Sequence, residues 1–305
     1  IAVGLSTKIL PHNFNELIDA SILHLKGKKF QISPDFLTAG VVDVSDYNDG
    51  LRGGKVRIRA KILQEDKTTL KITEIPYGTT TGSLIDSVLK ANDKGKIKIK
   101  KIEDNTAAEV EILIHLVPGS SPDKTIDALY AFTDCEISVS PNACVINDQT
   151  PEFLTVSEIL IHNTNNTVEL LKKELEIELD ELQEQWHFSS LERIFIENRI
   201  YHDIEEEETW EGVISAIDKG LKPYTAHLIR PVTEEDITRL TEIRIKRISK
   251  FDLDKAQQFI ESLEEKIENV KHHLANLSDY AIDYFKNLKT KYGKGKERKT
   301  EIRTF

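Results

Sequence analysis

Between positions 55 and 62 the chain reads KVRIRAKI, and every second residue is a cation. Because successive side chains of a strand point to opposite faces, a strand here would gather its cations on one face and its apolar residues on the other. A cationic strand face can contact the phosphates of a nucleic acid, and a merely solvated face is the alternative. The cations are Lys55, Arg57, Arg59 and Lys61.

The charge of the chain is unevenly distributed. The net charge of −11 argues against a uniformly basic nucleic-acid-binding protein. Residues 51–101, however, hold thirteen Lys or Arg against five Asp or Glu, whereas residues 151–305 hold 23 against 32. A basic early region is thus followed by an acidic late region, and this favours phosphate contact at 55–61 over simple solvation.

Cysteine content and hydropathy bound the class of protein. Cys135 and Cys144 are too few for a disulfide framework or a zinc site, and they fit a reducing cytoplasm. No apolar run reaches the length of a membrane span, and we expect no secretory leader. We therefore expect a cytoplasmic protein with no membrane partner. The first residue is Ile1 rather than Met, and we expect a fragment of a longer chain.

Metal and catalytic chemistry have little support in the sequence. The acidic run Glu205–Glu208 is best interpreted as a solvated segment. The pair His272-His273 is expected to face outward from a helix, and we do not expect it to bind a metal ion. We predict no metal site and no catalytic residue.

Two long helical patterns dominate the second half. From Asp252 to Thr290 apolar residues recur at steps of three and four for about five heptads, which is typical of a coiled coil. The natural antiparallel partner is the pattern in 154–195, with its best stretch from Leu171 to Trp186. The poor helix formers at 162–167, HNTNNT, predict a weak turn in that partner.

The residues between the two long patterns must form the far tip of the helix pair. Thr233 with Glu234 and Glu235 predicts a capped helix start with an acidic first turn. The helix that follows has an apolar stripe, which either caps the rod or contacts a second copy. Its residues are Ile237, Leu240, Ile243 and Ile248.

The first half reads as an α+β head with antiparallel strands, and it contains no Rossmann or P-loop glycine pattern. Asn13 is a predicted N-cap, with Glu16 as its capping-box partner. Lys8, Ile9 and Leu10 precede that helix in a loop. Composition alone favours packing of Ile9 into the local core.

Several segments resemble a known family. GLSTKILPHNFNELID (4–19), PDFLTAG (34–40), RGGKVRIRA (52–60) and EIPY (74–77) resemble signatures of type IIA DNA topoisomerases, and more closely the A subunit of bacterial DNA gyrase and topoisomerase IV. The tail Arg298–Ile302 also fits. The family pattern has proline where this chain has Leu10, and a Gln-Ala pair where it has Asp236-Ile237.

The resemblance implies a function for the head and the tip. An isoleucine at the place of Ile9 wedges between base pairs in the family and kinks the duplex, with an energetic cost of a few kcal/mol for unstacking. The resemblance thus implies an interface with double-stranded DNA and a homodimer through the apolar stripe of the tip. The implied DNA-binding residues are Lys8, Ile9, His12, Asn13, Lys55, Arg57 and Arg59.

The resemblance also implies a domain plan. It comprises a tower-like DNA-seating head (1–150), an ascending coiled-coil helix (151–186), a dimerisation tip forming an exit gate (187–251), a returning helix (252–290) and a tail that returns to the core (291–305). The parent protein would be an ATP-driven topoisomerase acting near the bacterial nucleoid, with ATP and Mg²⁺ bound by its ATPase B subunit.

The family cleaves DNA with a tyrosine in an Arg-Tyr-Thr context, and no such triplet occurs here. We therefore expect this chain to be inactive alone and to hold no cofactor. A non-enzymatic coiled-coil dimer that serves as a structural spacer is the alternative.

Overall fold

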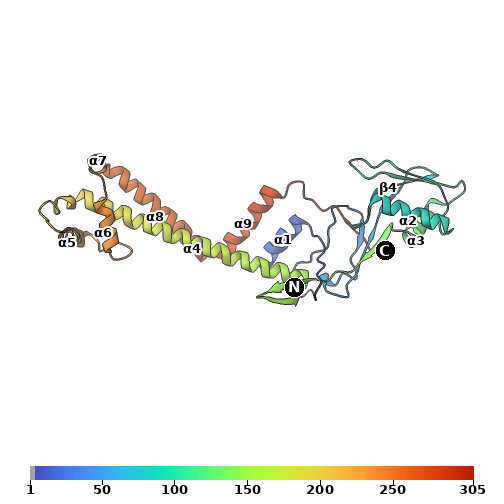
Figure 1. The fold of residues 1–305 in the computed structure, drawn as a ribbon, viewed down its shortest axis with the longest axis horizontal. Helices are drawn as coiled ribbons and strands as arrows, with labels where there is room; N and C mark the ends of the chain where they lie inside the picture. The colour runs from blue at the N-terminus through green and yellow to red at the C-terminus, as the bar shows by residue number, and fades with distance from the viewer. Residues whose placement is uncertain (1–3) are drawn as a thin grey trace. The chain divides into compact units, whose positions relative to one another are not determined.

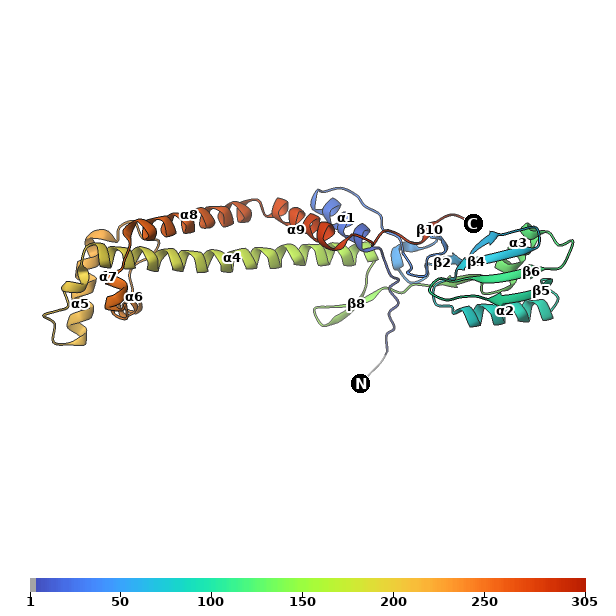
Figure 2. The ribbon, with the colours of Figure 1, turned by 90° about the horizontal axis from the view of Figure 1, so that it is seen from above.

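The computed structural model describes residues 4–305, apart from the side chain of Ile245. The chain divides into two compact units, one made of the residues up to 165 together with 282–305, and the other of residues 166–281. Figures 1 and 2 show the elements of both units. The expectation of a mixed α and β chain with a long helix is confirmed.

A four-stranded sheet lies in the first unit and has the order β10-β1-β2-β7. The pair β1–β10 is parallel, and the pairs β1–β2 and β2–β7 are antiparallel. Val42, Val56 and Ile58 have no exposed side-chain surface and form the core on one face of this sheet. The strands are β1 (Val41–Asp43), β2 (Val56–Arg59), β7 (Glu136–Val139) and β10 (Glu301–Ile302).

A second antiparallel sheet in the same unit has the order β3-β4-β6-β5. Leu70 and Ile72 of β4 lie opposite Ile114 and Ile112 of β6, so these four buried side chains share one face. Helices α2 and α3 cover that face through residues such as Leu84. The elements are β3 (Lys61–Gln64), β4 (Thr69–Glu74), β5 (Ile99–Asp104), β6 (Ile112–Leu116), α2 (Thr81–Asp93) and α3 (Pro122–Phe132).

The cationic stretch 55–62 is not one strand, as the sequence suggested, but two. β2 ends at Arg59, and β3 begins at Lys61 in the other sheet. Between them Ala60 is completely buried, and its N–H donates to the carbonyl of Cys135. Lys61 therefore lies in a different sheet from Arg57 and Arg59.

Smaller elements complete the first unit. Helix α1 (Phe14–Leu25) follows the Lys8–Leu10 segment, and a 3-10 turn covers Asn48–Gly50. A two-stranded hairpin, β8 (Cys144–Asn147) with β9 (Thr150–Phe153), leads into α4.

The second unit contains most of the 42-residue helix α4 (Val156–Glu197) and the elements that follow it. The helices are α5 (Trp210–Leu221), α6 (Glu234–Thr241), α7 (Ile245–Ser249), α8 (Leu253–Ala275) and α9 (Leu277–Tyr292), which continues into the first unit. Two 3-10 turns cover Ile200–His202 and Lys222–Tyr224.

Helices α4 and α8 lie side by side in both views (Figures 1 and 2). Leu175, Leu182 and Trp186 of α4 pack with Ile260 and Leu263 of α8. The indole of Trp186 donates to Glu264 Oε1 at 2.9 Å, and Arg193, further along α4, hydrogen-bonds to Gln257, nearer the start of α8. Residues with higher numbers in α4 thus contact residues with lower numbers in α8, so the two helices are antiparallel.

Two details of the long helices differ from the sequence prediction. The stretch 162–167 is helical, because α4 is continuous through it, and buried Thr164 donates to Ser21 Oγ at 2.9 Å. Tertiary contacts here override weak propensity. The second pattern is broken: Asn276 has φ −122° and ψ 46°, and its side-chain amide donates to the carbonyl of His272. The backbone angles of Asn276 are not helical, so α8 ends there.

Candidate nucleic-acid interface

Ile9 and Leu10 lie on opposite sides of the segment that precedes α1. Leu10 is only 3% exposed and belongs to the core of the first unit, whereas Ile9 is 44% exposed. The prediction that Ile9 packs into the local core is therefore wrong, because Leu10 is the residue of this segment that is buried there. Complete burial of such a side chain stabilises by about 1.5–3 kcal/mol, so the exposed surface of Ile9 leaves part of that free energy available to a partner.

Hydrogen bonds to Asn142 hold the segment that carries Ile9. The N–H of Lys8 donates to the carbonyl of Asn142 at 2.8 Å, and the N–H of Asn142 donates back to the carbonyl of Lys8 at 3.0 Å. The side chain of Asn142 donates to the carbonyl of Ser6 at 2.6 Å. These bonds fix the backbone before Ile9, and the buried side chain of Leu10 anchors the residue after it, while the side chains of Lys8 and Ile9 remain exposed.

Asn13 has a structural role that uses its whole side chain. Its Oδ1 accepts from the N–H groups of Asn15 and Glu16, which confirms the predicted N-cap. Its Nδ2 donates to Asp35 and to the carbonyl of Lys296. Both amide hydrogens are therefore used within the fold, and no donor remains for a phosphate.

The predicted capping box at this helix is only half formed. The carboxylate of Glu16 does not return to Asn13 but makes a bidentate ion pair with Arg298, at 2.6 and 2.5 Å. This pair ties the C-terminal tail to α1 within the first unit.

His12 lies beside Asn13 and meets Tyr47. The Nε2 of His12 and the hydroxyl of Tyr47 are 3.1 Å apart. Burial lowers the pKa of His12, so the ring is neutral at pH 7 and does not act as a cation. Burial likewise raises the pKa of Tyr47 above its usual range. The pair links the segment of Ile9 to the turn that precedes β2.

That turn also explains the glycines before β2. A Cβ on Gly54 would lie 2.3 Å from the carbonyl oxygen of Tyr47, which no side chain can tolerate. The N–H of Lys55 donates to the carbonyl of Asp46 at 2.8 Å. The close backbone approach at Gly54 therefore fixes the chain just before Lys55, where the cationic stretch begins.

Both cations of β2 are already paired, whereas Lys55, which precedes the strand, is not paired within the described residues. Arg57 faces Asp43 across β1, with Nη2 and Oδ2 2.5 Å apart, and Arg59 faces Glu136 across β7, with Nε and Oε2 2.6 Å apart. Hydrogen bonds from Ser45, aided by the charge of Arg57, lower the pKa of Asp43 to about 2. Lys55 is exposed and has no ion pair within residues 4–305.

The C-terminal residue covers the same two arginines. The guanidinium carbon of Arg59 lies 3.9 Å from the ring centre of Phe305 and 4.5 Å from that of Tyr130. Arg57 lies 5.0 Å from the Phe305 ring, and the N–H of Phe305 donates to Asp43. Nothing in the local sequence around 55–62 signals these partners, since they come from β1, α3, β7 and the tail.

The four predicted dimer residues come together in the tip. Ile237 and Leu240 are buried in the core of the second unit, against Leu191 and Phe195 of α4, and Ile243 and Ile248 pack at the edge of that core. The structure therefore uses Ile237 and Leu240 inside a single chain. A contact with a second copy has to use the edge of this core and the surfaces around it.

A charged cluster supports the helix that carries these residues. Asp236 accepts from both terminal nitrogens of Arg230, at 2.6 and 2.9 Å, and from Thr233 in a capping box. Burial acts to raise the pKa of Asp236, but these hydrogen bonds hold that pKa well below its usual range. His187 Nε2 lies 3.4 Å from the same carboxylate.

Comparison with known proteins agrees with the sequence signatures that lead to Ile9 and β2. The sequence model of the family described as the A subunit of DNA gyrase and topoisomerase IV matches residues 1–286. The chain belongs to this family.

The individual relatives are also A subunits of topoisomerase IV or DNA gyrase. The A subunit of DNA topoisomerase 4 from Borreliella burgdorferi is 38% identical over 302 residues, which cover 99% of this chain and 48% of that protein. The A subunit of DNA gyrase from Chlamydia muridarum is 24% identical over 298 residues, which cover 90% of this chain and 34% of the relative. The chain thus spans about half the length, or less, of these relatives.

Within residues 4–305, His, Cys, Asp and Glu side chains form no group of three or more that could hold a metal ion. In the same part of the chain, no helix is both long enough and apolar enough to cross a membrane.

Proposed function

We propose that this chain is the DNA-seating and dimer-forming part of the A subunit of a bacterial type IIA topoisomerase, either topoisomerase IV or gyrase. Its head binds gate-segment duplex DNA and bends it by inserting Ile9 between base pairs. The exposure of Ile9 beside buried Leu10 carries this proposal. An apolar wedge costs a few kcal/mol of unstacking, and the bent duplex returns this by contacting more protein surface.

Lys8 and Lys55 are the phosphate contacts in this proposal. Both side chains are exposed, and within the described residues neither takes part in an ion pair. Arg57 and Arg59 position the strand instead, since Asp43 and Glu136 already neutralise them. His12 and Asn13 support the segment of Ile9 rather than contact DNA directly.

The remaining parts of the proposal concern the whole protein. The pair α4–α8 serves as a coiled-coil spacer, and the tip forms the exit-gate homodimer. The ATPase B subunit of the enzyme binds ATP and Mg²⁺ and drives passage of one duplex through another, for decatenation or relaxation near the nucleoid. This chain supplies no nucleophilic tyrosine and does not cleave DNA alone. Covalent attachment of plasmid DNA to the isolated chain would contradict that statement.

Bending of labelled DNA tests the central claim. A duplex of about 30 base pairs with a donor and an acceptor dye at its ends is titrated with wild type and with Ile9→Ala. We expect wild type to raise the energy transfer and Ile9→Ala to bind with little change in transfer. Leu89→Ala is the matched control, because Leu89 on α2 is 40% exposed and should leave bending unchanged.

The spacer without DNA is the second candidate. The neutralisation of Arg57 and Arg59 favours it, because it removes two of the cations that the sequence offered for phosphate contact. Absence of salt-dependent DNA binding by wild type would support the spacer and refute the DNA seat.

A further inference from the structure

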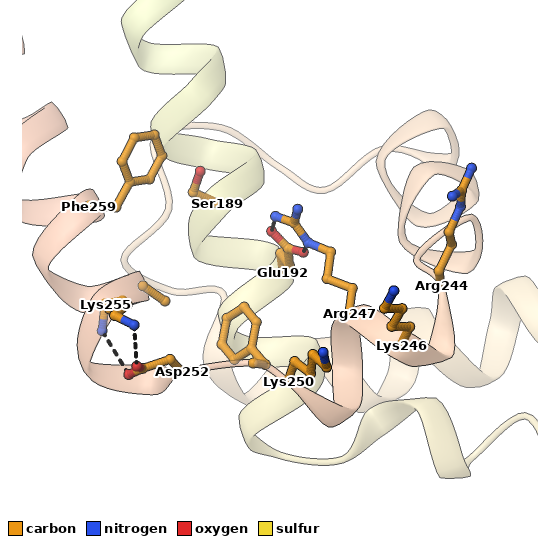
Figure 3. Close-up of a pocket in the computed structure, with 11 residues that line it drawn as sticks. Ser189, Glu192, Arg244, Lys246, Arg247, Lys250, Asp252, Lys255 and Phe259 are labelled. Carbon is orange, nitrogen blue, oxygen red and sulfur yellow. Dashed lines mark hydrogen bonds and ion pairs between the residues drawn. The ribbon is translucent and has the colours of Figure 1, made fainter.

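The tip carries a basic groove that is separate from the residues proposed to bind DNA. It has a volume of about 570 Å³ and lies among α4, α7 and the start of α8, within the second unit (Figure 3). Five cations and two carboxylates line it, with the aromatic rings of Phe251 and Phe259 as apolar walls. The cations are Arg244, Lys246, Arg247, Lys250 and Lys255.

Three of the five cations are free to meet an acidic partner. Arg247 reaches across to Glu192 in a bidentate pair, with Nη2 2.7 Å from Oε2, and Lys255 pairs with Asp252 at 3.3 Å (Figure 3). For Arg244, Lys246 and Lys250 the described residues provide no ion pair. The groove therefore has an unbalanced positive charge next to an exposed ring, since Phe259 is 50% exposed.

The same tip presents a segment with the opposite character. Four consecutive glutamates, Glu205–Glu208, are exposed, and Glu206 and Glu208 have no ion pair within residues 4–305. Trp210 begins α5 two residues later and is 53% exposed. Tryptophan is among the side chains that most often anchor an interface. The exposed Trp210 beside this run of carboxylates therefore points to a surface that contacts a partner.

We propose that the segment 205–210 of one copy docks into the basic groove of a second copy, so that two such contacts related by twofold symmetry close the tip dimer. Its carboxylates meet Arg244, Lys246 and Lys250, and Trp210 packs against the rings of the groove. A twofold dimer makes every contact twice, and complementary charge selects the correct partner. This inference rests on the homodimer of the proposed function and names its recognition.

Charge reversal in separate copies tests the pairing. One copy carries Lys246→Glu with Lys250→Glu, and the other carries Glu206→Lys with Glu208→Lys. Each variant alone brings like charges together at both contacts, and we expect its homodimer to weaken at least about tenfold. Mixed together, the two variants restore both contacts, so native mass spectrometry of copies that differ in mass should show mainly the heterodimer.

Lys266→Glu with Lys271→Glu is the matched control, since both lysines are exposed on α8 outside the groove and the charge change is the same. It should dimerise like wild type. In wild type the tryptophan emission should shift to shorter wavelength with increasing protein concentration, and Trp210→Phe should lose that shift.

The outcomes separate the two levels of the proposal. A wild-type dimer that is indifferent to both charge reversals refutes this pairing and leaves the homodimer intact. A wild-type chain that stays monomeric refutes the homodimer and this pairing with it, while the DNA seat is still judged by the bending experiment. Rescue only when all four substitutions lie in one chain would place the contact within a single copy and overturn the inference.

Discussion

Arg57 and Asp43 face each other across β2 and β1, and their Nη2 and Oδ2 atoms lie 2.5 Å apart. The sequence suggested that Arg57 is a free cation on a DNA-binding strand. In the fold it is the partner of a buried carboxylate, and the ring of Phe305 covers it. This relationship changes which residues are expected to hold DNA, and it has consequences for stability.

The first prediction concerns acid stability of the sheet that contains β1 and β2. Hydrogen bonds from Ser45 and the charge of Arg57 lower the pKa of Asp43 to about 2, against about 3.9 for an ordinary aspartate. Because the folded pKa lies below the unfolded one, this stabilisation is complete above about pH 4 and is lost as the pH falls toward 2. Hydrogen exchange of peptides from β1 and β2 between pH 2.5 and 6 measures this loss.

Asp43→Asn should flatten that pH dependence, and it should lower protection most above about pH 4, where the wild-type carboxylate is ionised. Asp46→Asn is the control, because Asp46 is exposed in the next turn. Equal pH dependence in wild type and Asp43→Asn would contradict the role given to this carboxylate.

The second prediction concerns the salt dependence of DNA binding. Each lost phosphate contact reduces the slope of log affinity against log salt by about 0.9. Lys8→Ala and Lys55→Ala should each cause such a reduction in fluorescence anisotropy titrations. Arg59→Gln should change the slope less, because Glu136 already pairs with Arg59. A larger reduction from Arg59→Gln, in a variant that remains folded, would mean that Arg59 leaves Glu136 to contact DNA.

The third prediction separates the two adjacent residues Ile9 and Leu10. Leu10→Ala removes a buried side chain and should lower the free energy of unfolding of the first unit by about 2–5 kcal/mol. Ile9→Ala should cost less than about 1 kcal/mol, because Ile9 is exposed. Urea titration followed by hydrogen exchange in α1 measures both. Similar losses for the two variants would place Ile9 in the core after all.

The fourth prediction concerns His187 in the second unit. Burial and the neighbouring Arg230 lower the pKa of His187, although Asp236 and Glu184 act in the opposite direction. In the unfolded chain His187 takes up a proton near pH 6.5, whereas in the folded chain it does so only at a lower pH. Stability of this unit should therefore fall as the pH decreases from 7.5 to 5.5, by at most about 1.4 kcal/mol per pH unit.

Tryptophan fluorescence isolates this effect, because both tryptophans, Trp186 and Trp210, lie in the second unit. His187→Phe should remove the dependence, and His202→Gln, which changes an exposed histidine, should keep it. A dependence that survives in His187→Phe would assign it to another group.

Much of the local structure could be predicted from the sequence. The N-cap at Asn13, the capped helix that follows Thr233 and the helical run from Leu171 to Trp186 follow from side-chain chemistry and periodicity over a few turns. The alternation in 55–60 also held, since Val56, Ile58 and Ala60 are all buried. Such features depend on neighbours in the chain, which a single sequence displays.

Other features depend on residues distant in the chain, and these the sequence could not predict. The family signatures, the alternation of charged and apolar residues in β2 and the helical periods could be read from the chain, because each lies in consecutive residues. The fold was needed to show that Leu10 rather than Ile9 is buried and that Asp43 and Glu136 neutralise Arg57 and Arg59. It also showed that Ile237 and Leu240 fill the core of the tip. The physical reason is that burial and ion pairing are set by strand register and helix packing, which bring together side chains tens of residues apart.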